Sequence, residues 1–361
     1  MTPDDSNLEI TKERGVVRSV VLIVAMQQEA MPFIERHSLV ECAPSPFQPG
    51  SPMVAYTGTI ECMSGGAIRI HLIWNGRCKI HNVNHVATTA AGVSTYAAIS
   101  SFHPDLVISA GTAGGFGELG AHVGDVYLST KCIFHGRRIP ISLKERSHQR
   151  YLEEYGFGHF RCPPMSRLAK ITGLKQGVVS SSDSLDSSEI DLEILLSEGA
   201  VVKEMEAAAV AWVCQQLAVP CVAIKSITDI VDGPHKSEDE FYHNLSIASD
   251  ALQEKLTVLI RQIGNTTLSQ WANNPPSRSG VVQEVDTVES TWSSSIEKEY
   301  DCFQPTNSRD EFNSKLNKQD LTQHYVLSKD FVHGTTLGIL VGVLGICFFS
   351  RIAFSNVRSA C

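Results

Sequence analysis

Short apolar runs rich in β-branched residues alternate with helix-like stretches through residues 16–263 of the chain. Apolar runs of this length are typical of buried strands. Strands alternating with helices predict an α/β domain. The predicted strands lie at 16–25, 53–56, 67–74, 105–110, 123–128 and 177–186, with further extended runs just before Glu206 and Asp229. The first predicted helix begins near residue 26. Further helices are predicted at 84–102 and 190–196, in the alanine-rich run after Glu206, and at 237–263.

The pattern changes after residue 263. Residues 264–330 are rich in Ser, Asn, Gln and Thr, which predicts a polar disordered linker, and residues 1–15 are expected to be flexible. Residues 331–349 then form a 19-residue apolar run without Asp, Glu, Lys or Arg. We interpret 331–354 as a transmembrane tail anchor rather than a buried helix of the domain. Gly334, Gly338 and Gly342 repeat every four residues, a spacing that can pack two such helices.

Composition narrows the possible compartments and partners. The 361 residues carry a formal net charge of −9, which argues against nucleic-acid binding. The ten cysteines are scattered without a C-x-x-C pair, so neither a zinc site nor a disulfide framework is predicted. The polar N-terminus does not read as a secretory signal. We therefore expect the domain on the cytosolic face of an intracellular membrane, with the organelle undetermined.

Three acidic residues stand where one predicted element gives way to another. Glu29 follows the first strand, Glu206 precedes the alanine-rich helix, and Asp229 ends an apolar strand. Ligands of open α/β sheets collect outside the carboxyl ends of the strands, so these acids predict an acid–base hydrolytic site. The alternative is structural, because an acid also stabilises a helix N-terminus and caps turns.

The segment Gly111–Gly117 is glycine-rich and predicts a loop through which a ligand can approach the backbone. It matches neither a P-loop nor a dinucleotide-binding fingerprint. His81 and His85 are four residues apart and could share a helix face, but without a third ligand they do not predict a metal site.

Six segments of the chain together match a known family pattern. They are V-A-M-Q-Q-E-A at 24–30, S-A-G-T-A-G-G-F at 109–116, F-H-G-R-R-I-P-I at 134–141, S-S-D-S-L-D at 181–186, K-E-M-E-A-A-A-V-A at 203–211 and S-I-T-D-I-V-D-G at 226–233. With these segments the chain resembles the 5′-methylthioadenosine/S-adenosylhomocysteine nucleosidases of the purine/uridine phosphorylase superfamily, the plant-type branch in particular. The resemblance implies a three-layer α/β fold around a mixed, partly closed sheet. It also implies a homodimer whose partner loops help close the site, and hydrolysis of an adenosine thioether to adenine and a 5-thioribose sugar without metal or cofactor.

The resemblance also implies a role for each acid. Asp229 would protonate the leaving adenine, Glu206 would bind the ribose hydroxyls and face the oxocarbenium-like sugar, and Glu29 would activate the attacking water. The substrate-binding residues that it implies are Met205, Thr112, Ala113, Gly114, Leu185, Asp186 and Thr228.

Two alternatives to the nucleosidase remain. A phosphate-dependent nucleoside phosphorylase is disfavoured because no arginine precedes the glycine-rich segment and because Glu29 would repel phosphate. A catalytically silent nucleoside-binding module at a membrane is disfavoured because all three acids are present. Three features depart from the family pattern. The segment Asn75–Val86 is looser than that pattern, Ser182 stands where the family usually has glycine, and a membrane anchor is not a usual feature of the family.

Overall fold

The computed structural model describes residues 15–139, 155–235 and 237–272, and all structural statements below concern these residues. The predicted transmembrane segment 331–354, the N-terminal segment 1–14 and residues 273–330 of the predicted linker lie outside the described residues. Residues 264–272 are described, and they continue the domain. Val16 pairs with Thr267, and Trp271 in the short 3-10 helix η2 (Leu268–Trp271) is buried in the core.

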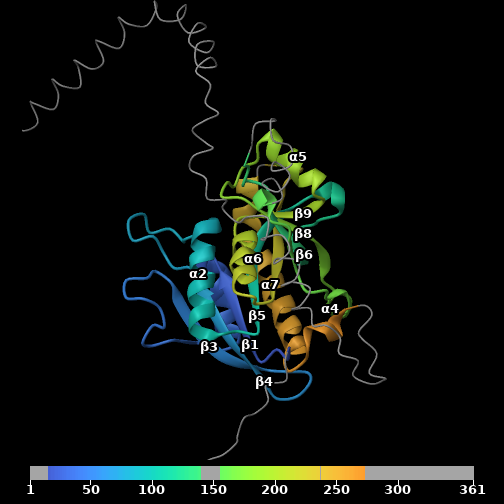
Figure 1. Ribbon diagram of the computed structural model, residues 1–361. Coiled ribbons are helices and arrows are strands. Elements are labelled where there is room, and N and C mark those ends of the chain that lie inside the picture. Colours follow the sequence, from blue (N-terminus) through green and yellow to red (C-terminus); the bar gives the residue numbers. More distant parts are fainter. Residues whose placement is uncertain (1–14, 140–154, 236, 273–361) are drawn as a thin grey trace, which may run out of the picture. The chain divides into compact units, whose positions relative to one another are not determined.

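A ten-stranded mixed sheet forms the centre of the domain (Figure 1). β10 pairs with β5 in parallel and with β6 antiparallel, so the five strands β10-β6-β8-β9-β5 close into a ring. The remaining strands extend this ring in the order β1-β4-β3-β2, and β7 pairs with β6. The strands are β1 (Ser19–Val24), β2 (Val40–Glu41), β3 (Val54–Glu61), β4 (Ala67–Trp74), β5 (Leu106–Gly115), β6 (Val126–Phe134), β7 (Phe160–Arg161), β8 (Lys175–Ser181), β9 (Ala200–Glu204) and β10 (Cys221–Ile230).

Helices cover both faces of the sheet, because successive strand residues point to opposite sides. In β1, Val20 and Leu22 enter one core together with side chains of α1, α4 and α7, whereas Val21 and Ile23 enter a second core with α2 and α6. The α/β fold with a mixed central sheet is therefore confirmed. The helices are α1 (Gln27–Arg36), α2 (Ala87–Phe102), α4 (Ser166–Thr172), α5 (Glu189–Ser197), α6 (Ala207–Gln216) and α7 (Ser237–Ile263).

Two local predictions were wrong. The glycine-rich segment is not a loop, since β5 continues through Gly115 and pairs there with Val202 and Ile230 of its two neighbours. Glycine is required because a Cβ at Gly115 would lie 2.7 Å from the Cβ of Ala121. The helix expected from residue 84 begins at Ala87, so His81 and His85 precede it and share no helix face.

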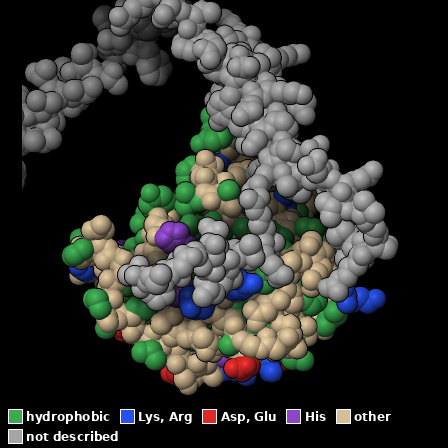
Figure 2. Space-filling model, turned by 60° about the horizontal axis from the view of Figure 1, so that its bottom comes forward, with side chains coloured by type: hydrophobic (Ala, Val, Ile, Leu, Met, Phe, Trp, Pro, Cys, Tyr) green, Lys and Arg blue, Asp and Glu red, His purple; other side chains and the backbone are tan. Residues whose placement is uncertain are grey.

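The surface of the domain mixes side-chain types. On the face shown in Figure 2, basic side chains lie in small groups among polar and hydrophobic ones. None of the helices in the described ranges combines the length and apolar character needed to cross a membrane.

Candidate active site

A cavity of about 180 Å³ opens where β5, β9 and β10 end beside the start of α1. The sheet register explains this meeting point, because Gly114 of β5 pairs with Asp229 of β10 on one side and with Lys203 of β9 on the other. All but one of the residues predicted for the site line this cavity, namely Glu29, Glu206, Asp229, Met205, Thr112, Ala113, Gly114, Leu185 and Thr228. Asp186 is exposed and does not line the cavity.

Glu29 lies in the first turn of α1 and is only 4% exposed. Its Oε1 accepts hydrogen bonds from the backbone N–H of Thr112 at 2.6 Å and from the Thr112 hydroxyl at 2.7 Å. Its Oε2 accepts the N–H of Met26 at 3.1 Å. Burial raises the pKa of Glu29, while the Thr112 hydrogen bonds and the charge of Lys225 oppose the rise. The carboxylate is thus held in one orientation and has an increased affinity for a proton.

Glu206 immediately precedes α6 and points back toward α2. Its Oε1 accepts the N–H of Ala87 at 2.8 Å, and its Oε2 lies 3.7 Å from Nζ of Lys225. Burial raises the pKa of Glu206 to about 7, and the negative charges of Glu204 and Glu29 add to the rise. Lys225 and the Ala87 N–H act in the opposite direction.

Asp229 lies at a β-bulge of β10, where the register with β5 shifts between Ile227 and Asp229. A bulge re-aims the side chain that it carries. The hydroxyl of Thr228 lies 2.8 Å from Oδ1 of Asp229 and 3.1 Å from the carbonyl oxygen of Ala113. Burial raises the pKa of Asp229, and the hydrogen bonds of Thr228 and Ser237 partly offset this. A proton on Asp229 is therefore favoured relative to an aspartate in water.

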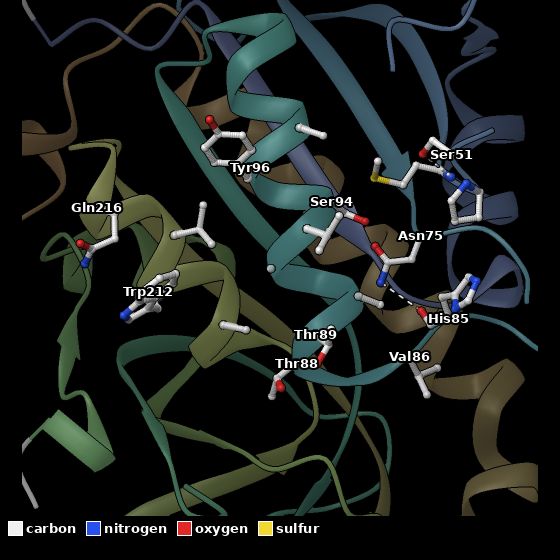
Figure 3. Close-up of a pocket in the computed structure, with 18 of the residues that line it drawn as sticks. Ser51, Asn75, His85, Val86, Thr88, Thr89, Ser94, Tyr96, Trp212 and Gln216 are labelled. Atoms are coloured by element: carbon white, nitrogen blue, oxygen red, sulfur yellow. Dashed lines mark hydrogen bonds between the residues drawn. The ribbon is translucent and has the colours of Figure 1, made fainter. Parts of the chain in front are cut away.

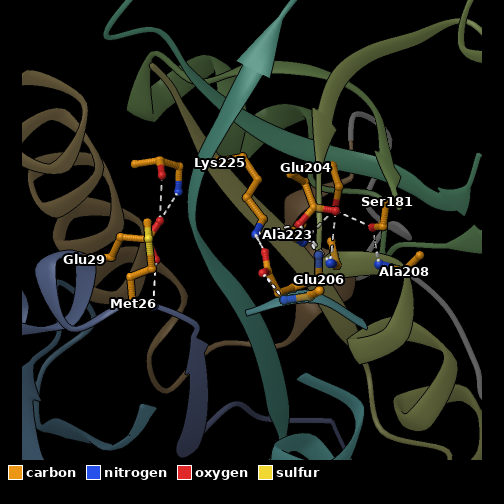
Figure 4. Close-up of polar contacts among 12 residues, drawn as sticks. Met26, Glu29, Ser181, Glu204, Glu206, Ala208, Ala223 and Lys225 are labelled. Atoms are coloured by element: carbon orange, nitrogen blue, oxygen red, sulfur yellow. Dashed lines mark hydrogen bonds and ion pairs between the residues drawn. The ribbon is translucent and has the colours of Figure 1, made fainter. Parts of the chain in front are cut away.

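The sequence did not predict the buried ion pair of Lys225 and Glu204, which lies next to Glu206 (Figure 4). Nζ of Lys225 lies 2.8 Å from Oε2 of Glu204, and both side chains are almost fully buried. Glu204 also accepts the N–H groups of Glu206 and Ala207 at 2.9 Å, and the Ser181 hydroxyl donates to it. Glu204 thus fixes the start of α6 and, with it, the position of Glu206.

A signal for this pair was present in the sequence. Lys225 is the one basic residue in the apolar strand C-V-A-I-K-S-I-T-D-I, and a charge that is buried must be paired. Burial lowers the pKa of Lys225, but the charges of Glu204 and Glu206 outweigh it and raise the pKa above the usual value for lysine. The remaining lining residues that were not predicted include Lys203 of β9 and Phe241 and Tyr242 of α7.

The described ranges hold no group of three or more His, Cys, Asp and Glu side chains placed to bind a metal ion. The chemistry that the cavity itself offers is proton transfer, because three carboxyl groups with raised pKa values and fixed hydrogen-bond partners meet in it.

Known proteins are similar to this chain in sequence and in fold. The sequence pattern of the phosphorylase superfamily matches residues 19–261. The 5′-methylthioadenosine nucleosidase of Arabidopsis thaliana is 37% identical over 253 residues, which are 70% of this chain and 90% of the relative. The 5′-methylthioadenosine/S-adenosylhomocysteine nucleosidase of the same plant is 38% identical over 257 residues, 71% of this chain and 96% of the relative.

A solved structure agrees with these relatives. The apo structure of the Arabidopsis thaliana 5′-methylthioadenosine nucleosidase superposes with a TM-score of 0.65 at 37% identity, covering 70% of this chain and 99% of that chain. The segments that carried the resemblance in the sequence thus fall within a domain matched over nearly the whole length of its relatives. The chain belongs to the phosphorylase superfamily and, within it, to the 5′-methylthioadenosine/S-adenosylhomocysteine nucleosidases.

Proposed function

We propose that the protein hydrolyses the N-glycosidic bond of 5′-methylthioadenosine, of S-adenosylhomocysteine or of both, and releases adenine and the 5-thioribose product. The observation that carries this proposal is the meeting of Glu29, Glu206 and Asp229 in one cavity, each with different hydrogen-bond partners. Two carboxyl groups that act as acid and base are the minimum for such hydrolysis, and a third can face the developing positive charge.

Asp229 acts as the general acid. Its raised pKa keeps a proton available for the purine nitrogen of the leaving base. As that proton is transferred, the C–N bond breaks and its electron pair leaves with adenine. Thr228, which lies 2.8 Å from Oδ1, holds the carboxyl group in place during the transfer.

Glu206 and Glu29 complete the reaction on the sugar. Glu206 binds the ribose hydroxyls and stabilises the oxocarbenium-like sugar through its negative charge. Glu29 accepts a proton from the attacking water, because Thr112 orients its carboxylate and burial increases its basicity. The new C–O bond to the sugar then yields the free sugar, which keeps its 5-thioether group.

Hydrolysis is favoured over phosphorolysis by the charges in the cavity. Among the described lining residues, the basic side chain is Lys203, and no arginine is present. A phosphate dianion would approach the carboxylates of Glu29 and Glu206, whereas water carries no charge to be repelled. Adenine release measured with and without added phosphate tests this proposal. Equal rates are expected, and a strict phosphate requirement would contradict hydrolysis.

We propose further that the protein is a homodimer through a largely apolar groove of about 1170 Å³ between α2 and α6 (Figure 3). Tyr96 of α2 is 59% exposed and Trp212 of α6 is 37% exposed, although both line this groove. Exposed apolar patches of this kind mark interaction surfaces. Val86 borders both the groove and the catalytic cavity, so a second copy seated in the groove would reach the cavity rim.

Sedimentation of the wild type and of Tyr96→Glu tests the dimer. We expect the wild type at twice the chain mass, and the variant shifted toward the monomer with weaker substrate binding. Ile171→Glu is the matched control, since Ile171 is 53% exposed on α4 away from the groove. A monomeric wild type would contradict the proposal.

We also propose that residues 331–354 anchor the enzyme in a membrane, with the catalytic domain on the cytosolic side. The uncharged run at 331–349 supports the anchor, and the free thiols of the seven cysteines in the described ranges support a reducing compartment. The full chain should sediment with membranes, and a chain ending at Asp330 should remain in the soluble fraction. Continued sedimentation of the shortened chain would refute the anchor.

A further inference from the structure

Lys203 lies on the same row of the sheet as Asp229. Asp229 of β10 pairs with Gly114 of β5, which pairs with Lys203 of β9, which in turn pairs with Ser180 of β8. Paired residues on neighbouring strands direct their side chains to the same face of the sheet. Two strand spacings separate the Cα atoms of Lys203 and Asp229, about 10 Å.

Gly114 leaves the space between these two side chains open. A Cβ built on Gly114 would lie 2.9 Å from Oδ2 of Asp229, so the carboxyl group leans over β5 toward β9. Lys203 is 8% exposed and lines the same cavity. Its Nζ donates a hydrogen bond to the carbonyl oxygen of Leu185, a second lining residue. Lys203 therefore lines the same cavity as Asp229, and its side chain is largely shielded from water.

We propose that Lys203 is a positioning residue for the acid step, whose ammonium group stabilises the carboxylate left on Asp229 after its proton has passed to the leaving base. This inference rests on the proposed hydrolysis. In that step the O–H bond of Asp229 breaks, an N–H bond forms on the purine, and the electron pair of the C–N bond stays with the base. The negative charge that appears on Asp229 is then balanced across β5 by Lys203. The hydrogen bond from Lys203 to the carbonyl oxygen of Leu185 additionally holds Leu185 at the rim of the cavity.

Other charged and polar groups also face the two partners. Asp229 is faced by Thr228 on its own strand and by Ser237 and Glu240 of α7, of which Glu240 raises its pKa and the hydroxyl groups lower it. Lys203 lowers the pKa of Asp229 as well. On the other side, Lys203 is faced by Asp186, Asp191 and His135. Among these groups that act on Asp229, Lys203 is the one with a basic side chain. Removing its charge should therefore raise the pKa of Asp229.

The test compares Lys203→Met with Lys203→Arg in the full chain, using the pH dependence of kcat/KM for adenine release. Loss of the cation raises the pKa of Asp229. The alkaline limb of the kcat/KM profile of Lys203→Met should therefore lie at a pH about one unit higher than in the wild type. The rate on the plateau should fall about tenfold, because the carboxylate product of the proton transfer is less stable. Lys203→Arg keeps the charge and should leave the limb in place.

Lys175→Met is the matched control, because Lys175 forms an exposed ion pair with Asp125 at 2.6 Å outside the cavity. If Lys203→Met does not fold, Lys203→Gln replaces it. A purely structural role would raise KM without moving the limb. An unmoved limb in an otherwise active variant, or an equal shift in Lys203→Arg, would overturn the inference and leave the proposed hydrolysis standing.

A second measurement needs no turnover. The carboxyl group of Asp229 is titrated by ¹³C NMR in aspartate-labelled protein, with Asp229→Asn used for assignment. We expect a higher pKa of Asp229 in Lys203→Met than in the wild type. If the wild type releases no adenine, the proposed function fails, and this titration alone decides whether Lys203 acts on Asp229. An unchanged pKa would refute that action.

Discussion

Replacing Glu206 with glutamine should stabilise the folded protein while it removes activity. The side chain of Glu206 is only 12% exposed, and its pKa is raised from 4.5 to about 7. Between these two values the folded protein binds a proton at Glu206 that the unfolded chain releases. Stability therefore falls as the pH rises through this window. Glutamine does not titrate, so Glu206→Gln avoids this loss.

The magnitude follows from the size of the shift. A rise from 4.5 to about 7, at about 1.4 kcal/mol for each pKa unit, corresponds to about 3 kcal/mol in the free energy of unfolding above pH 7. For a domain of this size we expect Tm to increase by about 6–12 °C. The ion pair between Lys225 and Glu204 remains in the variant, so Lys225 keeps a partner at 2.8 Å.

Thermal unfolding of the wild type and of Glu206→Gln at pH 4, 5, 6, 7 and 8 measures this effect. The difference in Tm should be large at pH 8, shrink as the pH falls through about 7, and be nearly absent below about pH 4.5. Glu193→Gln is the control, because Glu193 is exposed on α5 and should change stability by less than about 0.5 kcal/mol.

Activity provides the second readout of the same variant. Adenine release should fall at least a hundredfold, because glutamine offers no negative charge to the sugar cation. A variant that is less stable than the wild type at pH 8, or a stability difference that does not change with pH, would refute the assigned environment of Glu206.

Substitutions at four other positions test further parts of the site. Asp229→Asn should slow adenine release about 10²–10⁴-fold while substrate binding persists, and unchanged turnover would rule out Asp229 as the acid. Thr112→Val removes a donor to Glu29, so the acidic limb of the kcat/KM profile should move to higher pH, and a downward shift would contradict that contact. Lys225→Met leaves buried carboxylates without their cation and should lower the free energy of unfolding by about 3–5 kcal/mol, with a smaller loss for Lys225→Arg, as urea denaturation would measure. Gly114→Ala places a Cβ 2.9 Å from Oδ2 of Asp229 and should lower kcat in steady-state assays without preventing folding, whereas wild-type kcat would speak against the tight packing.

The sequence located the three acids because each stands at a boundary between elements. Glu29 and Glu206 mark the starts of α1 and α6, and Asp229 lies near the end of β10. The parallel strands β1, β5 and β10 bring Glu29 and Asp229 to one edge of the sheet. Glu206 reaches the same edge after β9, which is antiparallel to β5, so periodicity alone left open whether all three acids converge. Their specific roles came from the family resemblance and not from the periodicity.

Long-range pairing explains what the sequence did not reveal. Gly111–Gly115 has the composition of a loop, but strands on both sides extend it as part of β5. Lys225 resembles an interruption of an apolar strand until Glu204, twenty-one positions earlier in the chain, is placed 2.8 Å from it. The closure of the ring depends on β10 pairing with both β5 and β6, which local patterns do not encode.

The central claim is that water, activated by Glu29, attacks the sugar. Turnover of 5′-methylthioadenosine by the full chain in H₂¹⁸O, with mass spectrometry of the sugar and with Asp229→Asn as the inactive control, tests it most directly. We predict one ¹⁸O atom in 5-methylthioribose for each adenine released, with phosphate absent or present. A sugar 1-phosphate formed only when phosphate is supplied, with no ¹⁸O incorporated during turnover, would contradict the claim.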